Sequence, residues 1–236
     1  MIPIRAHAAW RGSADCQHCA IRATALFAEL REEDFRLIHE PIDDLGYGAG
    51  ESLYVPGPGA SCLYTLRSGM IKLLRHTPDG RERILRVLRP GDVAGLEALA
   101  GSDYDNQAVA LTEITVCRVP SQVIHRLSRD APRIYGMLMR KWHEALKQAD
   151  DWLAELNFGA AQQRVRHFAW HMRHPAEPAL TTLFARDDMG AMIGLQPETV
   201  SREISALLKE RILQRVDKSG RVYRILDPYR LREGDA

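Results

Sequence analysis

The chain has 236 residues, of which 45% are hydrophobic, so it can form one packed domain of ordinary size and a smaller second one. Its formal net charge of +1 excludes a basic field over the whole surface, and any affinity for nucleic acid must come from local placement of cations. No apolar run is long enough to cross a membrane, and residues 1–12 lack the apolar core of a signal peptide. We therefore expect a cytoplasmic protein without membrane contact, whose four cysteines are thiols or metal ligands rather than disulfides.

The first 40 residues contain a cysteine pair and two short helical patterns. Cys16 and Cys19 lie in a stretch without periodicity, which predicts a loop or an arm. Apolar residues at helical spacing then predict short helices over 24–30 and 32–39. The cysteine pair of a thiol oxidoreductase would lie next to a βαβ pattern, and no such pattern follows here. We therefore expect no catalytic activity.

From residue 47 the pattern changes to short apolar runs, separated by turns that contain glycine. The runs are SLYV (52–55), CLYTL (62–66), MIKLLRH (70–76), RERILRVL (81–88) and ITVCRV (114–119). This regular spacing is typical of antiparallel sheets and predicts a β-roll of the jelly-roll kind. With the helices that follow, the fold class is α+β, and residues 1–130 form an arm and a β-roll sensor domain.

A helical pattern replaces the strands after residue 120. It predicts a short helix over 121–129 and a long one from about 132 to 158, within a dimerisation segment of residues 131–158. Apolar residues recur in the long helix at alternating steps of four and three, at Tyr135, Met139, Trp142, Leu146, Ala149, Leu153 and Leu156. Such a stripe is narrower than a face that packs on its own domain. It therefore favours a homodimer seam over a helix that lies on its own domain.

The last domain, residues 159–236, contains two short helices joined by a tight turn. Asp187 is expected to cap the first helix, with Asp188 in its first turn, and Gly194 to end it in a left-handed conformation. Pro197 fits the first position of the second helix. The second helix has an apolar stripe at Val200, Ile204, Leu207 and Leu208 and a polar face at Glu198, Ser201, Arg202, Ser205 and Lys209.

This arrangement predicts a helix–turn–helix that binds double-stranded DNA. The second helix of such a motif enters the major groove, where Arg202 can bridge two acceptors of guanine and Glu198 can accept from cytosine. Residues 213–225 alternate around a turn that contains Gly220, which predicts a β-hairpin wing. We expect Ser201 to contact bases as well, and the cation of Lys218 and the hydroxyl of Thr199 to contact phosphates. The alternative is an ordinary helical hairpin with solvated charges.

The segment ARDDMGAMIGLQPETVSREISALLKERILQ resembles the DNA-binding segment of the cyclic-AMP receptor protein/FNR family of bacterial transcription regulators. Its E-x-x-S-R pattern at Glu198, Ser201 and Arg202 is similar to the FNR branch, which recognises TTGAT-type half-sites of palindromes. Gln196 departs from the Ser or Thr that is usual at that N-cap. The order of β-roll, pairing helix and winged helix–turn–helix extends the resemblance over nearly the whole chain. It implies a homodimeric transcription regulator that binds DNA and contacts RNA polymerase.

The resemblance also bears on the effector. Members that bind cyclic AMP hold its ribose with a Gly-Glu and its phosphate with an Arg-Ser pair, whereas residues 91–96 and 106–109 here are GDVAGL and NQAV. A buried phosphate would lack its charge-assisted partner, so we expect that cyclic AMP does not gate the protein. The segment GDVAGLEALAGSDYDNQAVALTEITVCRVP instead resembles FNR. A constitutive protein and a haem protein that uses His18, His39 or His76 are the alternatives.

FNR-type oxygen sensors bind a [4Fe–4S] cluster with three cysteines of the arm and one of the roll. Cys16 and Cys19 match two of the arm ligands, Cys117 matches the roll ligand, and Ala25 stands at the third arm position. The resemblance therefore implies a response to oxygen or redox state through these cysteines. It also implies pairing that depends little on a cofactor, because Ala149 lies near the acidic residue that helps to keep the cluster-free sensors monomeric.

Three thiolates do not complete a set of four ligands. The fourth ligand would be Cys62, Asp15, His18 or an outside molecule. Alternatively, the cluster has been lost together with the cysteine at position 25, and Cys62 is a small buried hydrophobe.

Overall fold

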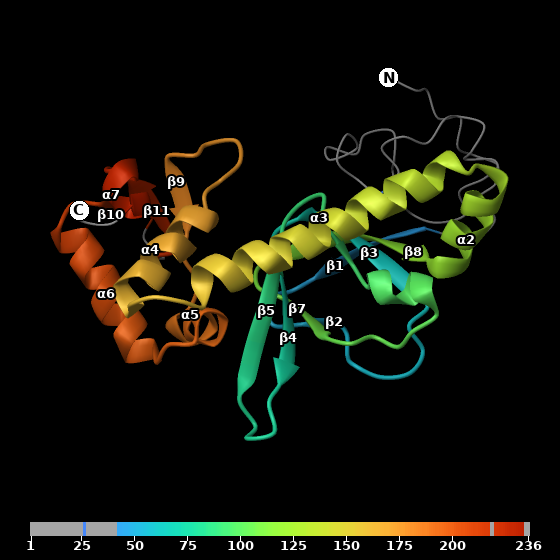
Figure 1. Cartoon of the computed structure of the whole chain (residues 1–236), viewed down its shortest axis with the longest axis horizontal. Coiled ribbons are helices and arrows are strands. Elements are labelled where there is room, and N and C mark those ends of the chain that lie inside the picture. Colours follow the sequence, from blue (N-terminus) through green and yellow to red (C-terminus); the bar gives the residue numbers. More distant parts are fainter. Residues whose placement is uncertain (1–25, 27–41, 218–219, 234–236) are drawn as a thin grey trace. The chain divides into compact units, whose positions relative to one another are not determined.

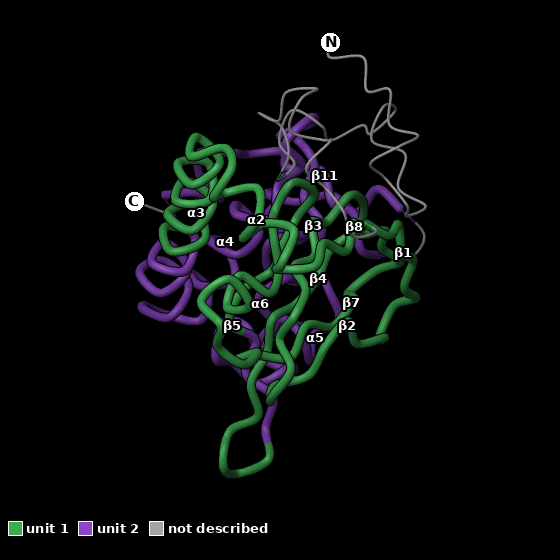
Figure 2. The backbone as a smooth tube through the Cα atoms, turned by 90° about the vertical axis from the view of Figure 1, so that its right-hand side faces the viewer, with its two compact units in different colours: residues 1–80, 85–147 green, residues 81–84, 148–236 purple. Residues whose placement is uncertain are grey.

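The computed structural model describes residue 26, residues 42–217 and residues 220–233 (Figure 1). Cys16, Cys19 and the helices expected over 24–30 and 32–39 lie outside the described residues, apart from Leu26. The chain divides into two compact units, one of residues 1–80 and 85–147 and one of residues 81–84 and 148–236 (Figure 2). Among the described helices, none is long and apolar enough to cross a membrane.

Two four-stranded sheets build the predicted β-roll. One has the strand order β1-β8-β3-β6 and the other the order β2-β7-β4-β5. The strands are β1 (Asp43–Tyr47), β2 (Ser52–Tyr54), β3 (Cys62–Ser68), β4 (Ile71–His76), β5 (Glu82–Leu88), β6 (Val93–Ala94), β7 (Gln107–Ala110) and β8 (Ile114–Pro120). The five predicted runs are confirmed as β2, β3, β4, β5 and β8, whereas β1, β6 and β7 were not predicted.

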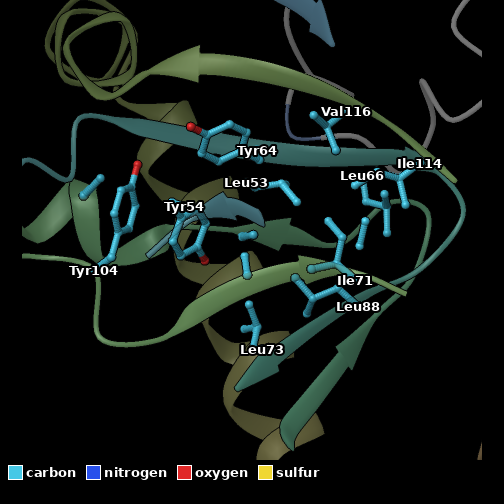
Figure 3. Close-up of a cluster of buried hydrophobic side chains, with 14 residues drawn as sticks. Leu53, Tyr54, Tyr64, Leu66, Ile71, Leu73, Leu88, Tyr104, Ile114 and Val116 are labelled. Atoms are coloured by element: carbon cyan, nitrogen blue, oxygen red, sulfur yellow. The ribbon is translucent and has the colours of Figure 1, made fainter. Parts of the chain in front are cut away.

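An apolar interior lies between the two sheets (Figure 3). Because side chains alternate between the faces of a strand, Tyr64 and Leu66 of β3 point into it together with Ile114 and Val116 of β8. The ring of Tyr54 stacks on that of Tyr104, with centroids 4.0 Å apart, and Tyr64 lies 5.6 Å from Tyr54. The interior is therefore filled by aromatic and aliphatic side chains.

The opposite face of the first sheet packs on helices. These are the 3-10 helix η2 (Leu96–Ala100), α2 (Ser121–Asp130) and the first part of α3 (Arg133–Leu156). Leu63 and Val119 of the sheet join Leu127 of α2 and Met137 of α3 in one buried cluster, which also contains Leu26. The long helix α3 begins in the first unit and ends in the second.

The second unit combines helices with a small sheet. Its elements are α4 (Ala161–His171), β9 (Leu180–Thr182), α5 (Arg186–Ile193), α6 (Pro197–Lys209), β10 (Leu213–Arg215), β11 (Val222–Ile225) and α7 (Pro228–Glu233). The predicted hairpin is confirmed as β10 and β11, and β9 adds a third strand in the order β10-β11-β9. Buried Arg166 of α4 donates to Glu210 (3.3 Å) and to the carbonyl of Arg230 (3.1 Å), which joins α4 to the ends of α6 and α7.

Candidate DNA-binding surface and sensor region

A tight turn joins α5 to α6 and fixes the helix–turn–helix. Gly194 ends α5 with a φ of 65°, in the left-handed region, and Pro197 begins α6, both as predicted. Gln196 makes no side-chain cap, in keeping with its departure from Ser or Thr. The cap expected at Asp187 is wrong, because α5 already begins at Arg186, and Asp187 lies in the first turn beside Asp188. There both carboxylates face the positive end of the helix dipole.

Gly190 of α5 allows the backbone of Leu195, after the turn, to lie directly against the helix. The carbonyl of Gly190 accepts the N–H of Leu195 (3.1 Å), which draws the backbone after the turn onto α5. A Cβ atom at position 190 would lie 2.5 Å from the carbonyl oxygen of Leu195. Only glycine leaves room for this backbone contact, and the sequence analysis did not single it out.

The two faces of α6 have opposite characters. Val200, Ile204 and Leu207 are buried and pack toward α4 and α5, whereas Leu208 is only half-buried. The polar face is exposed at Glu198, Ser201, Arg202, Ser205 and Lys209. Thr199 is half-buried, and Lys218 lies outside the described residues. The first two turns of α6 therefore present an acid, a hydroxyl and a guanidinium to solvent.

Arg202 and Ser205 differ in how far their polar groups are already engaged. The side chain of Arg202 is 71% exposed, and its Nε lies 3.3 Å from Glu203. Exposed ion pairs of this kind contribute little, so the guanidinium can exchange Glu203 for a base. The hydroxyl of Ser205 donates to the carbonyl of Ser201 (2.8 Å) within the helix. Arg202 is therefore the better donor to a base edge.

The wing presents cations that the sequence analysis missed. Asp217 closes its turn by accepting the N–H groups of Arg221 (3.0 Å) and Val222 (2.9 Å). Arg215 on β10 and Arg221 on the other side of the turn are both exposed. Strand alternation could not have identified Arg215, because it places residue 215 on the same face as buried Leu213, whereas Gln214 and Arg215 are both exposed.

In the β-roll, the two described cysteines lie on neighbouring strands of one sheet. Cys117 of β8 pairs with Asp44 of β1 on one side and with Thr65 of β3 on the other. Its side chain packs against the cluster that contains Leu26 and the helices. Cys62, the first residue of β3, packs instead against the interior between the sheets. The sheet thus separates the two side chains.

This separation does not fit a [4Fe–4S] cluster bound by all four cysteines, which needs every thiolate around one cube. Within the described part of the chain, no three His, Cys, Asp or Glu side chains form a group able to hold a metal ion. His76 lies exposed at the end of β4, while the candidate ligands Asp15, His18 and His39 lie outside the described residues. Cys62, Asp15, His18 and an outside molecule stay predictions for the fourth ligand, and the packing of Cys62 away from Cys117 counts against Cys62.

The segment at residues 105–109, where the resemblance would place the phosphate-binding pair, is contacted by an arginine from another strand. Arg75 of β4 donates to Asn106 (2.8 Å) and to the carbonyl of Asp105 (3.1 Å), and its side chain is 55% exposed. Inside the roll, burial raises the pKa of the Tyr54 and Tyr104 phenols, so both stay neutral at physiological pH. A phenol carries no positive charge and the Arg75 side chain is exposed, so none of these three side chains supplies a buried cation for a phosphate.

The predicted seam on α3 is mostly exposed in the single chain. Its members Tyr135, Met139, Trp142, Leu146 and Leu153 are between 40% and 59% exposed, and Ala149 is half-buried. Leu156 departs from the expectation, because it is completely buried at the end of the helix. The exposed stripe therefore ends at Leu153. An exposed apolar stripe of this length is typical of an interaction surface.

Comparisons with known protein families match both halves of the chain. A family model described as a cyclic nucleotide-binding domain matches residues 45–130, and one described as a Crp-like helix-turn-helix domain matches residues 163–233. Together they span about two thirds of the chain. The second match lies on the helix–turn–helix and wing described above, and it identifies this unit as a DNA-binding domain.

Relatives and solved structures agree with these matches. The fumarate and nitrate reduction regulatory protein of Vibrio cholerae is 28% identical over 207 residues, 84% of this chain and 82% of the relative. An anaerobic regulatory protein of Pasteurella multocida is 27% identical over 205 residues, 84% of this chain and 75% of the relative. The structure of FixK2 from Bradyrhizobium japonicum has a TM-score of 0.73 at 26% identity and covers 84% of this chain and 98% of its own. The chain is a DNA-binding transcription regulator of the cyclic-AMP receptor protein/FNR family, and not an enzyme.

Proposed function

We propose that this regulator acts as a homodimer that recognises TTGAT-like palindromes with α6, has RNA polymerase as a further partner, and responds to oxygen or redox state. The observation that carries the proposal is the exposed first half of α6, where Glu198, Ser201 and Arg202 share the polar face. Donors and acceptors in this order on a recognition helix suit base edges in the major groove. The name of the Pasteurella relative, an anaerobic regulatory protein, supports a response to oxygen.

The homodimer is supported by the exposed stripe on α3. A stripe with steps of four and three pairs two parallel helices about a two-fold axis. The same axis relates two recognition helices and therefore matches a palindromic site. The half-buried Ala149 on the stripe adds no charge to the seam, so dimerisation should not require a bound cofactor.

The redox response is assigned to Cys16, Cys19 and Cys117. Support comes from Leu26, which follows Cys19 by seven residues and is buried in the same cluster against which Cys117 packs. The three thiols are either ligands of an iron–sulfur cluster whose remaining ligand is not Cys62, or thiols that are oxidised directly. Iron, sulfide and haem analysis of anaerobically purified protein, together with its absorption spectrum, distinguishes these states. Equal DNA affinity before and after exposure to air would contradict a redox response.

Replacing Arg202 by alanine should lower the affinity for a TTGAT-like site by about 1–3 kcal/mol, roughly fivefold to 150-fold, and relax specificity at one base pair. The guanidinium is exposed and its partner Glu203 holds it weakly, so the loss comes from the base contact. Titrations on TTGAT-like and scrambled duplexes at one salt concentration measure this. Lys218→Ala is the control, since a phosphate contact weakens binding to both duplexes alike. An equal loss on both duplexes for Arg202→Ala would refute the base contact.

Cyclic AMP should not bind at micromolar concentration or change DNA affinity. Asn106 and Gln107 stand where the phosphate-binding Arg-Ser pair is found in members that bind it, and Arg75 reaches that loop already bound to Asp105 and Asn106. A buried phosphate would lose its water without compensation. Calorimetric titration of the protein with cyclic AMP tests this, and a saturable micromolar isotherm would contradict it.

A further inference from the structure

We infer that Cys62 cannot share a metal site with Cys117, so that at most three of the four cysteines can bind one cluster. The inference rests on the proposed redox function only for the role of the other cysteines. The placement of Cys62 and Cys117 follows from the register of β3 against β8.

The register decides which face each side chain occupies. Cys117 lies opposite Thr65, and Cys62 lies opposite Pro120. Residues directly opposite each other on paired strands share a face, and successive residues alternate between faces. Cys62 is three positions from Thr65 and therefore points to the other face from Cys117. Three residues also separate them by roughly 10 Å along the strands, at about 3.3 Å per residue.

The packing on both faces agrees with this register. Cys117 packs with the cluster of Leu63, Val93 and Val119, and Cys62 packs with the cluster of Tyr64 and Leu66. Bringing Cys62 to the face of Cys117 would need a slip of β3 by one residue. Such a slip moves every side chain of the strand to the opposite face and would expel Tyr64 and Leu66 from the interior.

Tyr104 holds Cys62 in place as well. Its hydroxyl donates to the carbonyl of Cys62 (2.7 Å) and accepts the N–H of Cys62 (3.2 Å). The ring of Tyr104 is itself stacked on Tyr54 in the interior. The first residue of β3 is thus fixed at its backbone, and its thiol cannot swing around the edge of the sheet.

Anaerobic reconstitution with ferrous iron and sulfide tests the inference on the wild type, Cys62→Ala and Cys117→Ala. We expect Cys62→Ala to bind as much iron and sulfide per protomer as the wild type, whereas Cys117→Ala loses most of both. Unfolding midpoints of all three proteins exclude a loss through misfolding, and Cys62→Ser serves if Cys62→Ala is unstable. A loss in Cys62→Ala as large as that in Cys117→Ala, at an unchanged midpoint, would overturn the inference.

A wild type that binds no iron would remove the cluster from the proposed function without deciding where Cys62 points. A cadmium titration of the Cys16→Ser, Cys19→Ser double variant, which keeps only Cys62 and Cys117, then decides. The ultraviolet thiolate-to-cadmium absorbance should reach the intensity of one thiolate per ion. An absorbance equal to two thiolates per ion would show a shared site and refute the inference, provided that adding either Cys62→Ala or Cys117→Ala to the double variant removes it.

Discussion

Replacing Gly190 by alanine should destabilise the helix–turn–helix by about 3 kcal/mol and abolish specific DNA binding. The added Cβ would lie 2.5 Å from the carbonyl oxygen of Leu195, a distance that real Cβ atoms do not show. Because that oxygen belongs to the backbone, no side-chain rotation relieves the contact, and the turn itself must move. The turn sets the angle between α5 and α6, so even a folded variant would present Arg202 in the wrong orientation.

The matched control is Gly136→Ala in α3. Its Cβ would meet only Arg140 Nη1 at 3.8 Å, an ordinary contact. Alanine is favoured over glycine inside a helix by about 0.5–1 kcal/mol, so this variant should gain stability. Hydrogen exchange of α5 and α6 measures the effect of Gly190→Ala locally, and that of α3 measures the effect of Gly136→Ala, because a chain of two units need not unfold in two states. DNA titrations compare the binding of both variants. If α6 of Gly190→Ala exchanged its amide hydrogens as slowly as in the wild type, the predicted destabilisation of the helix–turn–helix would be wrong.

The sequence predicted the elements whose start, end and buried face are set by residues within the element itself. In α6, Pro197 sets the start and the apolar stripe sets the buried face, so helix and orientation both followed from local pattern. Strand β1 was not predictable, because its Asp43 and Asp44 are typical of a turn. They are stabilised there by Arg118, whose Nε donates to Asp43 (3.1 Å), and by Arg67, which pairs with Asp44. Both partners lie far away in the sequence.

The position of Cys62 was unpredictable for a different reason. Strand β3 is buried on both faces over Leu63, Tyr64, Thr65 and Leu66, so its sequence shows no alternation of polar and apolar residues. Without alternation, a strand can be recognised while its two faces cannot be assigned. Only the pairing with β8 separates Cys62 from Cys117.

Leu156 shows a limit of heptad patterns. The spacing of four and three continues through it, but the end of α3 belongs to the second unit. There Leu156 is buried, and the ring of the neighbouring Trp152 packs edge-on against Phe168, with centroids 6.3 Å apart. A periodic stripe indicates a face of the helix, and it does not indicate where along the helix that face changes its partner.

Replacing Leu146 by glutamate should dissociate the proposed homodimer. The side chain is 56% exposed in the single chain, near the middle of the stripe, so it would be covered only by a second copy. Each dimer would lose two buried leucines, at about 2 kcal/mol apiece, which raises the dissociation constant about a thousandfold. The two introduced carboxylates would also face each other across the two-fold axis, where neither has a partner for its charge.

Ala154→Glu is the matched control, because it adds the same carboxylate at an exposed position of α3 outside the stripe. It should leave the dimer unchanged in sedimentation equilibrium of the cofactor-free protein, while Leu146→Glu sediments as a monomer. Two recognition helices linked in one dimer bind a palindrome more tightly than either helix alone. Leu146→Glu should therefore lose most of its affinity for the palindrome, while its affinity for an isolated half-site stays the same. A cofactor-free wild type that is monomeric at micromolar concentration would refute the seam. A dimeric Leu146→Glu would place the pairing surface elsewhere.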